Sequence, residues 1–589
     1  MKSIIREDDI EQAICTRLSL PEFGWKRIEC DPSVAAQDDV SKTGRANPSE
    51  CILPEVFRNA LKRLNPWMDE EMIEGIVNDY RKDYTGTDMV ETNYRFYNQL
   101  RNGIKLDTRT EQGDDFDIVK LIDFEHVENN DFHCVNQMWI KGHYNYRRPD
   151  VLLFVNGLPV VFVELKNSTV KVEEAYNKNL VSYRKDIPNI FALNQICVLS
   201  NGLMTKMGAW NAGYEYFFEW LRVNDEKEHI DREKIAEYGL SVTNLMDGLF
   251  RKERLIDYIE NFVFFDNKRT KIIAKNHQYL GVNNLMANVE RRGELKGKLG
   301  VFWHTQGSGK SYSMVMFVRK VRRKVKGNFT FLVITDREDL DTQIHKTFVR
   351  TEVIGPKEEC QPKDSAQLRE YLSSNKTMLF TLIHKFGYDK SKKYPLLTER
   401  DDIFVLVDEA HRTQYKQLAE NMHTGIPNAN YIAFTGTPLL GSKRLTGNVM
   451  GLTGSAPTAL SMVAVYVLHN MSMTPVHIAE FSIGSNCESR PEKLLSDGAR
   501  SLGMTVTEVP RNNNRLSQAV KEKGSAVICM MKSQEFSSFI VVKGVDEDGN
   551  FLIIDPSNKK RSETHYSFSQ LNTGIKRIWK YSTVSEDNP

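Results

Sequence analysis

The feature that most constrains the fold of this chain is an apolar strand that runs into a glycine-rich turn and then into a helix. From Val301 to Ser311 the sequence reads Val-Phe-Trp-His-Thr-Gln-Gly-Ser-Gly-Lys-Ser, and a helical pattern follows over residues 312–325. Such a turn lets backbone N–H groups point inward, and the helix N-terminus behind it favours a bound anion. Because strands and helices alternate from Gly300 onward, the pattern predicts a phosphate site in a parallel α/β domain.

The residues of this turn have the roles expected for binding ATP together with Mg2+. Lys310 is expected to contact the β and γ phosphates, and the Ser311 hydroxyl is expected to bind Mg2+. The backbone N–H groups around the phosphates come from Gly307, Ser308 and Gly309. His304 stands where the usual pattern has its first glycine. The alternative is a glycine turn with a surface lysine.

A second apolar strand ends in two carboxylates. Residues 403–411 read Ile-Phe-Val-Leu-Val-Asp-Glu-Ala-His. Asp408, at the strand end, can hold Mg2+ through water, and Glu409 can orient or deprotonate the water that attacks the γ phosphate. His411 is expected to couple this site to DNA. Taken alone, the segment could instead be a strand-to-helix cap.

Upstream, a predicted β-hairpin carries three charged residues that together could form a nuclease site. Its strands are joined by Asn156-Gly157, with Asp150 before the first strand and Glu164 and Lys166 at the end of the second. Glu164 and Lys166 project from one face, and Asp150 can lie beside them. The two carboxylates can bind Mg2+, which activates water, while Lys166 positions the nucleophile. Charged strand ends are common, so the pattern alone is a weak signal.

Several short segments closely resemble sequence segments of one protein family. They are Leu121-Ile122-Asp123-Phe124, Asn129-Asn130-Asp131-Phe132, Asn136-Gln137, Arg147-Arg148-Pro149-Asp150-Val151, Phe154 to Pro159 and Phe302 to Ser311. With the motifs above, they make residues 1 to about 446 resemble the amino-terminal part of type I restriction enzyme motor subunits. The resemblance implies Mg2+-dependent cleavage of double-stranded DNA, ATP-driven DNA translocation, and assembly with methylation and specificity subunits.

The resemblance also assigns roles to residues outside the main motifs. Gln278 matches the glutamine expected to read the adenine of ATP, and Glu11 matches a family acid that completes the nuclease site. The family's Gln and Tyr after the catalytic strand are Asn179 and Tyr183 here. Here the chain departs from the family pattern. Because Asn is shorter than Gln by one methylene, this side chain is less well suited to position DNA or metal.

Two further segments resemble helicase motifs. Thr335-Asp336-Arg337 resembles a strand-end motif that contacts DNA, and residues 434–438, Phe-Thr-Gly-Thr-Pro, resemble the motif that links ATP state to DNA. A complete motor of this kind needs a second RecA-like domain that supplies arginines to the γ phosphate, and we find none in the sequence. We therefore expect ATP binding with slow hydrolysis.

After Leu445 the sequence changes character. Residues 452–462 resemble the start of a papain-like cysteine peptidase of the peptide-processing type, and residues 539–556 resemble its later strands. The nucleophile position is Ser455 and the histidine position is Ser538, while the acid position keeps Asp555. Since a serine without a base is a poor nucleophile, we predict a papain-like fold without peptidase activity. His565 is expected to be a surface histidine.

Charge and composition limit the class of protein. Lys and Arg number 79 and Asp and Glu 78, so the net charge is +1 and any DNA-binding surface must come from local clusters. The basic run 319–324 is a candidate DNA contact, although such a run also fits a solvated helix face. The eight cysteines form no CxxC pair, and the most apolar stretch, residues 459–468, is too short to cross a bilayer. We expect a cytoplasmic protein without a membrane partner.

These observations predict an α/β protein with four parts. They are a restriction-endonuclease-like domain at residues 1–225, a helical connector at 226–290 with the adenine-reading glutamine, one RecA-like helicase domain at 291–446 and a degenerate papain-like α+β domain at 447–589. Within the first part, helices are expected over residues 8–20 and from near Pro66 to Tyr80.

Three functions remain open from the sequence. The first is a DNA-cutting, ATP-dependent motor subunit of a restriction system. The second is a catalytically silent scaffold derived from such a subunit, with a peptide-binding tail. The third is an active peptidase fused to a DNA-binding body.

Overall fold

The computed structural model describes most residues from 6 to 583. The residues outside the description are 1–5, 32, 34–39, 111–112, 226–227, 229, 231–234, 236–240, 304–308, 375, 388–393, 409–415, 436–454, 469–472, 474, 476, 479–480, 482–490, 533–535, 557–558 and 584–589. The chain divides into two units. Unit 1 comprises Met1–Asp408 and Gln417–Phe434, and unit 2 comprises Glu409–Lys416 and Thr435–Pro589.

A seven-stranded mixed sheet forms the first core of unit 1, in the order β1-β4-β7-β8-β9-β10-β11. Its strands are β1 (Lys26–Glu29), β4 (Phe132–Asn136), β7 (Val151–Val155), β8 (Leu158–Leu165), β9 (Ile196–Ser200), β10 (Thr205–Gly208) and β11 (Phe218–Glu219). β7 and β8 pair antiparallel, whereas β8 and β9 pair parallel. Every residue of β7 and β8 is buried, which explains why both strands are almost wholly apolar.

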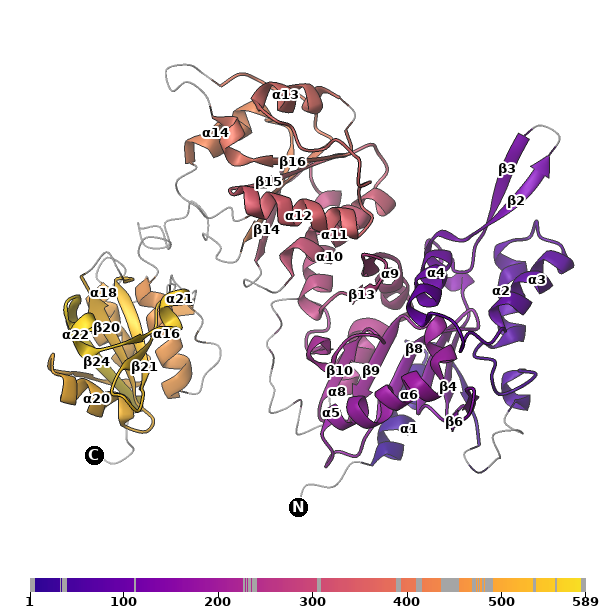
Figure 1. Ribbon diagram of the computed structural model, residues 1–589, viewed down its shortest axis with the longest axis horizontal. Coiled ribbons are helices and arrows are strands. Elements are labelled where there is room, and N and C mark those ends of the chain that lie inside the picture. Colours follow the sequence, from indigo (N-terminus) through magenta and orange to yellow (C-terminus); the bar gives the residue numbers. More distant parts are fainter. Residues whose placement is uncertain are drawn as a thin grey trace. The chain divides into compact units, whose positions relative to one another are not determined.

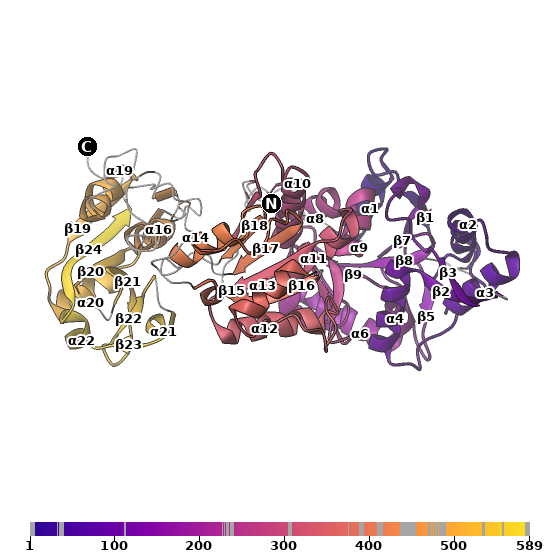
Figure 2. The ribbon, with the colours of Figure 1, turned by 90° about the horizontal axis from the view of Figure 1, so that it is seen from above.

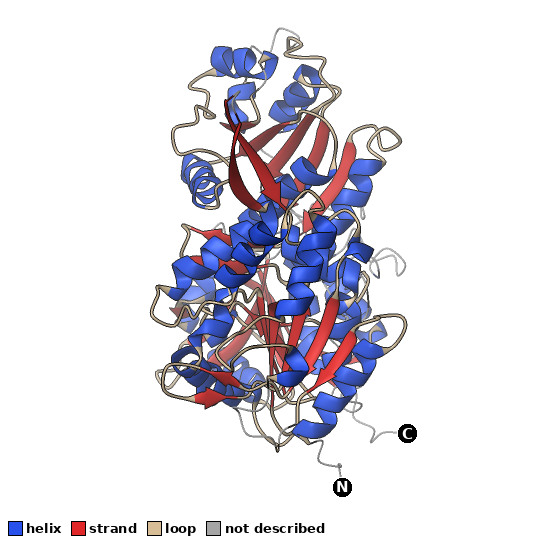
Figure 3. Ribbon diagram, turned by 90° about the vertical axis from the view of Figure 1, so that its right-hand side faces the viewer, coloured by secondary structure: helices blue, strands red, loops and turns tan. Residues whose placement is uncertain are grey.

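Helices cover both faces of this sheet (Figure 3). On one face, α1 (Glu7–Ser19) packs Ile10 and Ile14 into the same cluster as Val151 and Leu153. On the other face, the π-helical segment η3 (Ala175–Leu180) and α6 (Val181–Asp186) pack against Leu152 and its neighbours. The remaining helices of this part are α2 (Pro54–Leu64), α3 (Glu70–Tyr80), α4 (Met89–Asn102) and α5 (Val172–Glu174).

The turn between β7 and β8 has the predicted hairpin form. Asn156 and Gly157 have φ angles of 50° and 79°, as a two-residue turn between twisted strands requires. A Cβ added at Gly157 would lie 2.5 Å from the carbonyl oxygen of Leu53, so the close approach of this loop also requires glycine. The predicted hairpin is therefore confirmed.

The helix predicted from near Pro66 begins four residues later. α3 starts at Glu70 because the Asp69 side chain caps it, accepting a hydrogen bond from the backbone N–H of Met72 at 2.8 Å. Residues 116–122, which have a strand-like pattern, lie partly in β3 (Gly113–Val119). This strand pairs with β2 (Ile104–Thr110) in a separate hairpin that extends from the body of unit 1 (Figure 1).

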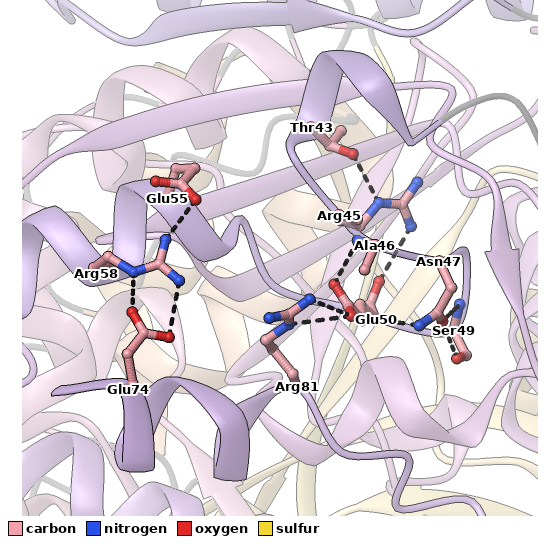
Figure 4. A network of polar contacts seen from close by, with 10 residues as sticks. All are labelled: Thr43, Arg45, Ala46, Asn47, Ser49, Glu50, Glu55, Arg58, Glu74 and Arg81. Carbon is pink, nitrogen blue, oxygen red and sulfur yellow. Dashed lines mark hydrogen bonds and ion pairs between the residues drawn. The ribbon is translucent and has the colours of Figure 1, made fainter. Parts of the chain in front are cut away.

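Polar contacts, some of them buried, link the segment before α2 and α2 itself to α3 (Figure 4). Arg45 is buried and its Nη1 donates to the carbonyl oxygen of Glu50 at 3.1 Å. The Glu50 carboxylate accepts a hydrogen bond from Arg81 Nη2 at 2.9 Å. In parallel, Arg58 of α2 contacts Glu74 of α3. Because each buried charge has a partner, burial here does not leave an uncompensated charge.

The predicted connector contains strands as well as helices. Its elements are α8 (Ser241–Leu245), the π-helical η6 (Met246–Phe250), α9 (Lys252–Asn261), β12 (Val263–Asp266), β13 (Thr270–Ile273) and α10 (Asn276–Glu290). β12 and β13 pair antiparallel, so the expectation of a purely helical connector was wrong. The apolar run Val263–Phe265 is short and bounded by polar residues, a pattern that fits a strand as well as a helix.

A five-stranded sheet forms the second core of unit 1, in the order β14-β18-β17-β15-β16. Figure 2 labels β15, β16, β17 and β18 of this sheet. Its strands are β14 (Lys298–Trp303), β15 (Thr330–Thr335), β16 (Met378–Leu382), β17 (Ile403–Asp408) and β18 (Asn430–Thr435). The helices around it are α11 (Lys310–Lys324), α12 (Glu338–Arg350), α13 (Ser365–Ser373) and α14 (Lys416–Gly425). The pairings of β15 with β16 and β17, and of β17 with β18, are all parallel. The predicted parallel α/β domain is confirmed.

The basic run 319–324 at the end of α11 makes contacts within unit 1. Lys320 is buried and its Nζ donates to Asp257 of α9. Lys324 Nζ lies 2.7 Å from Glu260 Oε2 of the same helix. A solvated helix face therefore does not describe Lys320, and contact of this run with DNA stays a prediction.

Unit 2 contains a six-stranded antiparallel sheet in the order β19-β24-β20-β21-β22-β23 (Figure 2). Its strands are β19 (Met504–Glu508), β20 (Ala526–Met531), β21 (Phe539–Val545), β22 (Phe551–Ile554), β23 (His565–Tyr566) and β24 (Ile575–Thr583). The helix α16 (Ser455–Leu468) packs on one face, while α20 (Asn513–Lys521) and α22 (Phe568–Asn572) pack on the other. Within the described part of the chain, no helix is both long and apolar enough to cross a membrane.

Candidate functional site

The end of the seven-stranded sheet where β7 begins and β8 finishes carries the predicted nuclease residues. The register pairs Val151 with Val163, so Asp150 and Glu164 come next along the two strands. Asp150 Oδ2 accepts a hydrogen bond from the backbone N–H of Leu165 at 2.6 Å. The hairpin thus brings the two carboxyl groups to one end of the sheet.

Lys166 lies beside these carboxyl groups. Its Nζ is 3.3 Å from Glu164 Oε1 and donates to the carbonyl oxygen of Leu165 at 2.5 Å. The Lys166 side chain is 15% exposed and that of Glu164 is 2% exposed, so the pair is shielded from bulk water. The structure therefore gathers the two predicted metal ligands and the predicted lysine at one site.

Both carboxyl groups are electrostatically unfavourable as anions in the absence of a cation. Burial raises the pKa of Asp150 to about 7, although Leu165 N–H and Lys166 oppose the shift. Burial, reinforced by the neighbouring Asp150, raises the pKa of Glu164 well above its ordinary value. Perturbed carboxyl groups of this kind are typical of functional sites.

The donor set at this edge fits Mg2+. Glu164 Oε2 is buried and has no hydrogen-bond partner among the described residues. A divalent cation would satisfy this oxygen and reverse the pKa shifts of both carboxyl groups. Among those same residues, no group of three or more His, Cys, Asp or Glu could hold a metal ion. Two carboxylates are nevertheless sufficient for Mg2+, which usually keeps several waters and binds phosphate oxygens.

The pKa of Asp150 leads to a prediction about stability. A folded-state pKa of about 7 lies above the unfolded value of about 3.9, so the stabilisation is present at low pH and is lost as pH rises through about 7. In EDTA, we expect Asp150→Asn to gain thermal stability relative to the wild type as pH rises from 5 to 8. Calorimetry of both proteins measures this difference, and a constant difference across that range would contradict the assignment.

The acid that the resemblance assigned to the nuclease site has other direct partners. Glu11 of α1 is buried, and its Oε1 accepts a hydrogen bond from Asn136 Nδ2 at 2.8 Å. Gln137 Nε2 donates to the other carboxylate oxygen. Burial raises the pKa of Glu11 despite these hydrogen bonds. Its contacts are thus to the end of β4, and its role in completing the site stays a prediction.

Asn179 reaches the site although it is shorter than the expected glutamine. Its Nδ2 donates to Glu164 Oε1. Asn179 lies in the π-helical segment η3, and such segments occur frequently at functional sites. Tyr183, on α6, donates to the carbonyl oxygen of Arg148 at 3.3 Å, and it also lies close enough to Glu164 to oppose the rise in the pKa of that carboxyl group. The substitution therefore preserves an amide contact to Glu164.

The predicted phosphate site lies where β17 ends and α11 begins. Gly309 has a φ angle of 96° and directly precedes α11, as a tight turn into a helix requires. Lys310 Nζ is 3.3 Å from Asp408 Oδ1, and both side chains are largely buried. Ser311 follows on the first turn of α11 and is half-buried. The lysine expected to bind phosphate and the carboxylate expected to hold Mg2+ are thus in contact.

Gln278 contacts the turn that leads into α11. Its Nε2 donates to the carbonyl oxygen of Gly309 and to Ser313 Oγ, both at 3.1 Å. Its Oε1 accepts a hydrogen bond from the backbone N–H of Lys275 at 2.9 Å. The predicted adenine-reading glutamine therefore lies directly against the phosphate turn, and adenine recognition itself stays a prediction.

Several predicted site residues lie outside the described part of the chain. They are Gly307, Ser308, Glu409, His411 and the segment 436–438. The first helicase-like motif is described in full. Thr335 ends β15, and Arg337 lies just before α12 and contacts Asp339 at 2.6 Å. Of the second motif, residues 434 and 435 are described. Thr435 ends β18. These strand ends belong to the same sheet as the phosphate site.

The peptidase-like residues of unit 2 are two serines and an aspartate. Ser455 begins α16, and Ser538 directly precedes β21. Asp555 is buried, and its carboxylate accepts hydrogen bonds from the Ser537 backbone N–H at 3.1 Å and from the Ser537 hydroxyl. Arg561 Nη1 lies 3.2 Å from Asp555 Oδ2. The acid that would orient a histidine therefore has other partners.

His565 does not take the place of that base. Its Nδ1 is 2.7 Å from Asp546 Oδ2, and its side chain is half-exposed. The expectation of a surface histidine is confirmed.

Unit 2 is expected to show no peptidase activity, because a nucleophile, a base and an orienting acid must act together. With a fluorogenic peptide, we expect no hydrolysis by the full chain or by Ser455→Cys or Ser538→His alone. Combining both with Arg561→Ala, which releases Asp555, is expected to give the largest gain. Hydrolysis by the unaltered chain that disappears on Ser455→Ala would overturn this prediction.

One residue at the nuclease site has no place in the sequence motifs. Glu7 Oε1, on the first turn of α1, lies 3.7 Å from Lys166 Nζ. Glu7 precedes Glu11 by four residues, and this helical spacing puts both acids on one face of α1. That spacing is the signal that could have identified it.

Three family models match successive parts of the chain. Residues 4–216 match the type I restriction enzyme R protein N terminus, and residues 277–470 match the SWI2/SNF2 ATPase. Residues 453–578 match the peptidase C39 family.

Among curated proteins, the endonuclease subunit of the type I restriction enzyme HindI from Haemophilus influenzae is 35% identical over 76% of this chain and 44% of that protein. A putative type I restriction enzyme MjaIXP endonuclease subunit from Methanocaldococcus jannaschii is 34% identical over 77% of this chain and 45% of that protein. The chain thus spans less than half the length of these relatives. The UvsW helicase from bacteriophage T4 is a structural match over 33% of this chain and 63% of that chain, with 14% identity and a TM-score of 0.24.

Proposed function

Over the 76% of its length that aligns with the Haemophilus influenzae relative, the chain belongs to the type I restriction enzyme endonuclease subunits, and we propose that it cuts double-stranded DNA with Mg2+. We further propose that its ATPase domain moves DNA at the expense of ATP. The observation that carries the first proposal is the convergence of Asp150, Glu164 and Lys166 at one sheet end, with Glu164 Oε2 buried and without a partner among the described residues.

The chemistry follows from the placement of these side chains. Asp150 and Glu164 would hold Mg2+, which supplies an activated water and neutralises charge on the scissile phosphate when it is bound. Lys166 Nζ, beside Glu164, is placed to hydrogen-bond the attacking water or a phosphate oxygen. Water attacks phosphorus, one P–O bond breaks, and the leaving oxygen takes a proton. Asn179 holds Glu164 Oε1 from the opposite element, η3.

The ATPase domain offers the matching parts for nucleotide. Lys310 would leave Asp408 for the β and γ phosphates, and Asp408 would then hold Mg2+ through water. Gln278 holds the turn just before Lys310 by donating a hydrogen bond to the Gly309 carbonyl oxygen. ATP binding is therefore expected to rearrange the Lys310–Asp408 ion pair.

We also propose partners and a place of action. Methylation and specificity subunits would choose the DNA sequence, as the family resemblance implies. The cytoplasmic location expected from the sequence stays a prediction.

Metal binding tests the nuclease proposal without requiring turnover. At pH 8, Mg2+ is expected to raise the thermal midpoint of the wild type, because it compensates the buried charges of Asp150 and Glu164. The combined variant Asp150→Asn, Glu164→Gln should lose that response. Each measurement is made without nucleotide, with Mg2+ in one arm and EDTA in the other, so that ATP binding at the second site does not contribute. An equal Mg2+ response in the variant would contradict the proposed metal site.

A catalytically silent scaffold is the second candidate function. The observation that favours it is the Asp555 carboxylate, which contacts Ser537 and Arg561 where an active peptidase would place a histidine. In that case the tail binds peptide without cleaving it. Retained peptide binding without DNA cleavage would favour this candidate.

A further inference from the structure

A carboxylate outside the nuclease motif lies against the predicted catalytic lysine. Glu7 and Glu11 both project from α1, but their contacts differ. Glu11 faces the end of β4 through Asn136 and Gln137. Glu7 faces the end of β8, where Lys166 lies. The acid of α1 that contacts the site directly is therefore Glu7.

Glu7 is fixed in place by two reciprocal hydrogen bonds. Its backbone N–H donates to Asn167 Oδ1 at 3.0 Å, and the backbone N–H of Asn167 donates to Glu7 Oε1 at 3.2 Å. Glu7 is the first residue of α1, whose initial N–H groups have no partner within the helix. The pair thus satisfies a helix end and ties α1 to the residue that follows Lys166.

The same oxygen that accepts from Asn167 also faces the lysine. Glu7 Oε1 is 3.7 Å from Lys166 Nζ. The same Nζ also contacts Glu164 Oε1 at 3.3 Å and the Leu165 carbonyl oxygen at 2.5 Å. A lysine has a flexible four-carbon stem, so its ammonium needs external contacts to stay in one position. Three acceptors from two elements surround it here.

The contribution of Glu7 becomes larger when the site is loaded. A cation held by Glu164 would compete with Lys166 for the charge of that carboxylate. Glu7 then remains the carboxylate that attracts the ammonium from the side of α1. Without Glu7, the Leu165 carbonyl oxygen and a weakened attraction to Glu164 would hold Lys166 at the sheet end.

We propose that Glu7 is a positioning residue of the nuclease site, which holds the Lys166 ammonium beside Glu164 through its carboxylate charge. This inference rests on the proposed nuclease function. It assigns Glu7 no contact with DNA and no place among the metal ligands.

The test separates the charge of Glu7 from its structural bonds. Glu7→Gln keeps an oxygen that can accept from the Asn167 N–H, but it removes the charge. With plasmid DNA, Mg2+, ATP and the partner subunits, we expect its cleavage rate at saturating DNA to fall about 10- to 100-fold, the usual range for a residue that orients a site. The DNA dissociation constant and the Mg2+ concentration for half-maximal cleavage should change far less than this rate, because Glu7 is assigned no contact with DNA or metal.

Matched variants decide between positioning and general disruption. Asp8→Asn removes the same charge from the neighbouring, exposed position of α1 and should cut like the wild type. Glu7→Asp should recover part of the rate lost in Glu7→Gln. Asn167→Ala removes the side-chain oxygen that accepts from the Glu7 backbone N–H, but it keeps the Asn167 backbone donor and the charge of Glu7, so it should lose less activity than Glu7→Gln.

The outcomes distinguish this inference from the proposed function. If the wild type does not cut, or if Glu164→Ala cuts normally, the proposed nuclease function fails and the inference fails with it. If the wild type cuts, Glu164→Ala does not, and Glu7→Gln cuts at the wild-type rate, the inference alone is overturned. It is also overturned if Asn167→Ala loses as much activity as Glu7→Gln, because the bonds rather than the charge would then matter.

Discussion

Replacing Glu164 with Ala is expected to abolish DNA cleavage while leaving the fold and ATP binding intact. Glu164 is one of two carboxylates that would hold Mg2+, and it also contacts Lys166 and Asn179, so its loss removes a ligand and frees two neighbours. Residues that only orient a metal site cost about 10- to 100-fold when replaced, and a direct ligand should exceed that range. Gel analysis of supercoiled, nicked and linear plasmid measures the effect.

The thermal stability of Glu164→Ala shows whether a loss of cleavage comes from unfolding. Burial raises the pKa of Glu164, so at pH 8 in EDTA removing the group should lower the thermal midpoint less than the loss of an ordinary core side chain does. Glu173→Ala removes the same charge from an exposed position nearby on α5 and should cut normally. DNA cleavage by Glu164→Ala at the wild-type rate would contradict the assignment of this site as the nuclease site.

A protein of residues 1–589 is expected to bind ATP with Mg2+ but to hydrolyse it slowly, with little stimulation by DNA. The described residues contain one parallel sheet of the motor type, with Lys310 and Asp408 in contact. Arginines supplied from a second motor half can accelerate hydrolysis by about 10³- to 10⁵-fold. Phosphate release with and without DNA, at saturating ATP, measures the rate.

Lys310→Ala tests the contribution of this lysine to nucleotide binding in the same protein. Losing one charged hydrogen bond to phosphate, worth about 1.5–3 kcal/mol, should weaken nucleotide binding roughly 10- to 100-fold. Lys326→Ala, at an exposed position just beyond α11, is the matched control and should bind normally. Brisk DNA-stimulated hydrolysis by the unaltered protein would show that its motor is more complete than we infer.

Local sequence patterns predicted the elements that carry the chemistry. The hairpin of β7 and β8 follows from two apolar runs and Asn156-Gly157, whose left-handed backbone few other residue pairs adopt as readily. The parallel sheet follows from repeated apolar strands with charged residues at their ends. In both cases the information lies within a few residues of the element, so the sequence is sufficient.

Contacts between distant segments could not be predicted in this way. The Glu7–Lys166 contact depends on how α1 docks on the sheet, and the motif around Lys166 contains no trace of it. The pairing of Lys320 with Asp257 likewise depends on how α9 packs against α11, so a charge run that suggests solvent or DNA has a buried member. Ser537 and Arg561 became the partners of Asp555 through folding of unit 2.

The start of α3 shows the smaller error of boundary prediction. Pro66 can begin a helix, but the capping side chain of Asp69 sets the actual start at Glu70. The strand β12 shows the larger error, because a short apolar run does not reveal its own secondary structure. In both cases a neighbouring contact decides the outcome.

The decisive measurement for the proposed nuclease is plasmid cleavage by the full chain with Mg2+ and ATP, with or without methylation and specificity subunits. We expect linear product that requires Mg2+ and the partner subunits, and that disappears with Asp150→Ala, Glu164→Ala or Lys166→Ala. Binding of nucleotide should persist in those three variants. Intact supercoiled plasmid under every condition, from a folded chain that binds ATP and its partner subunits, would contradict the account and favour the silent scaffold.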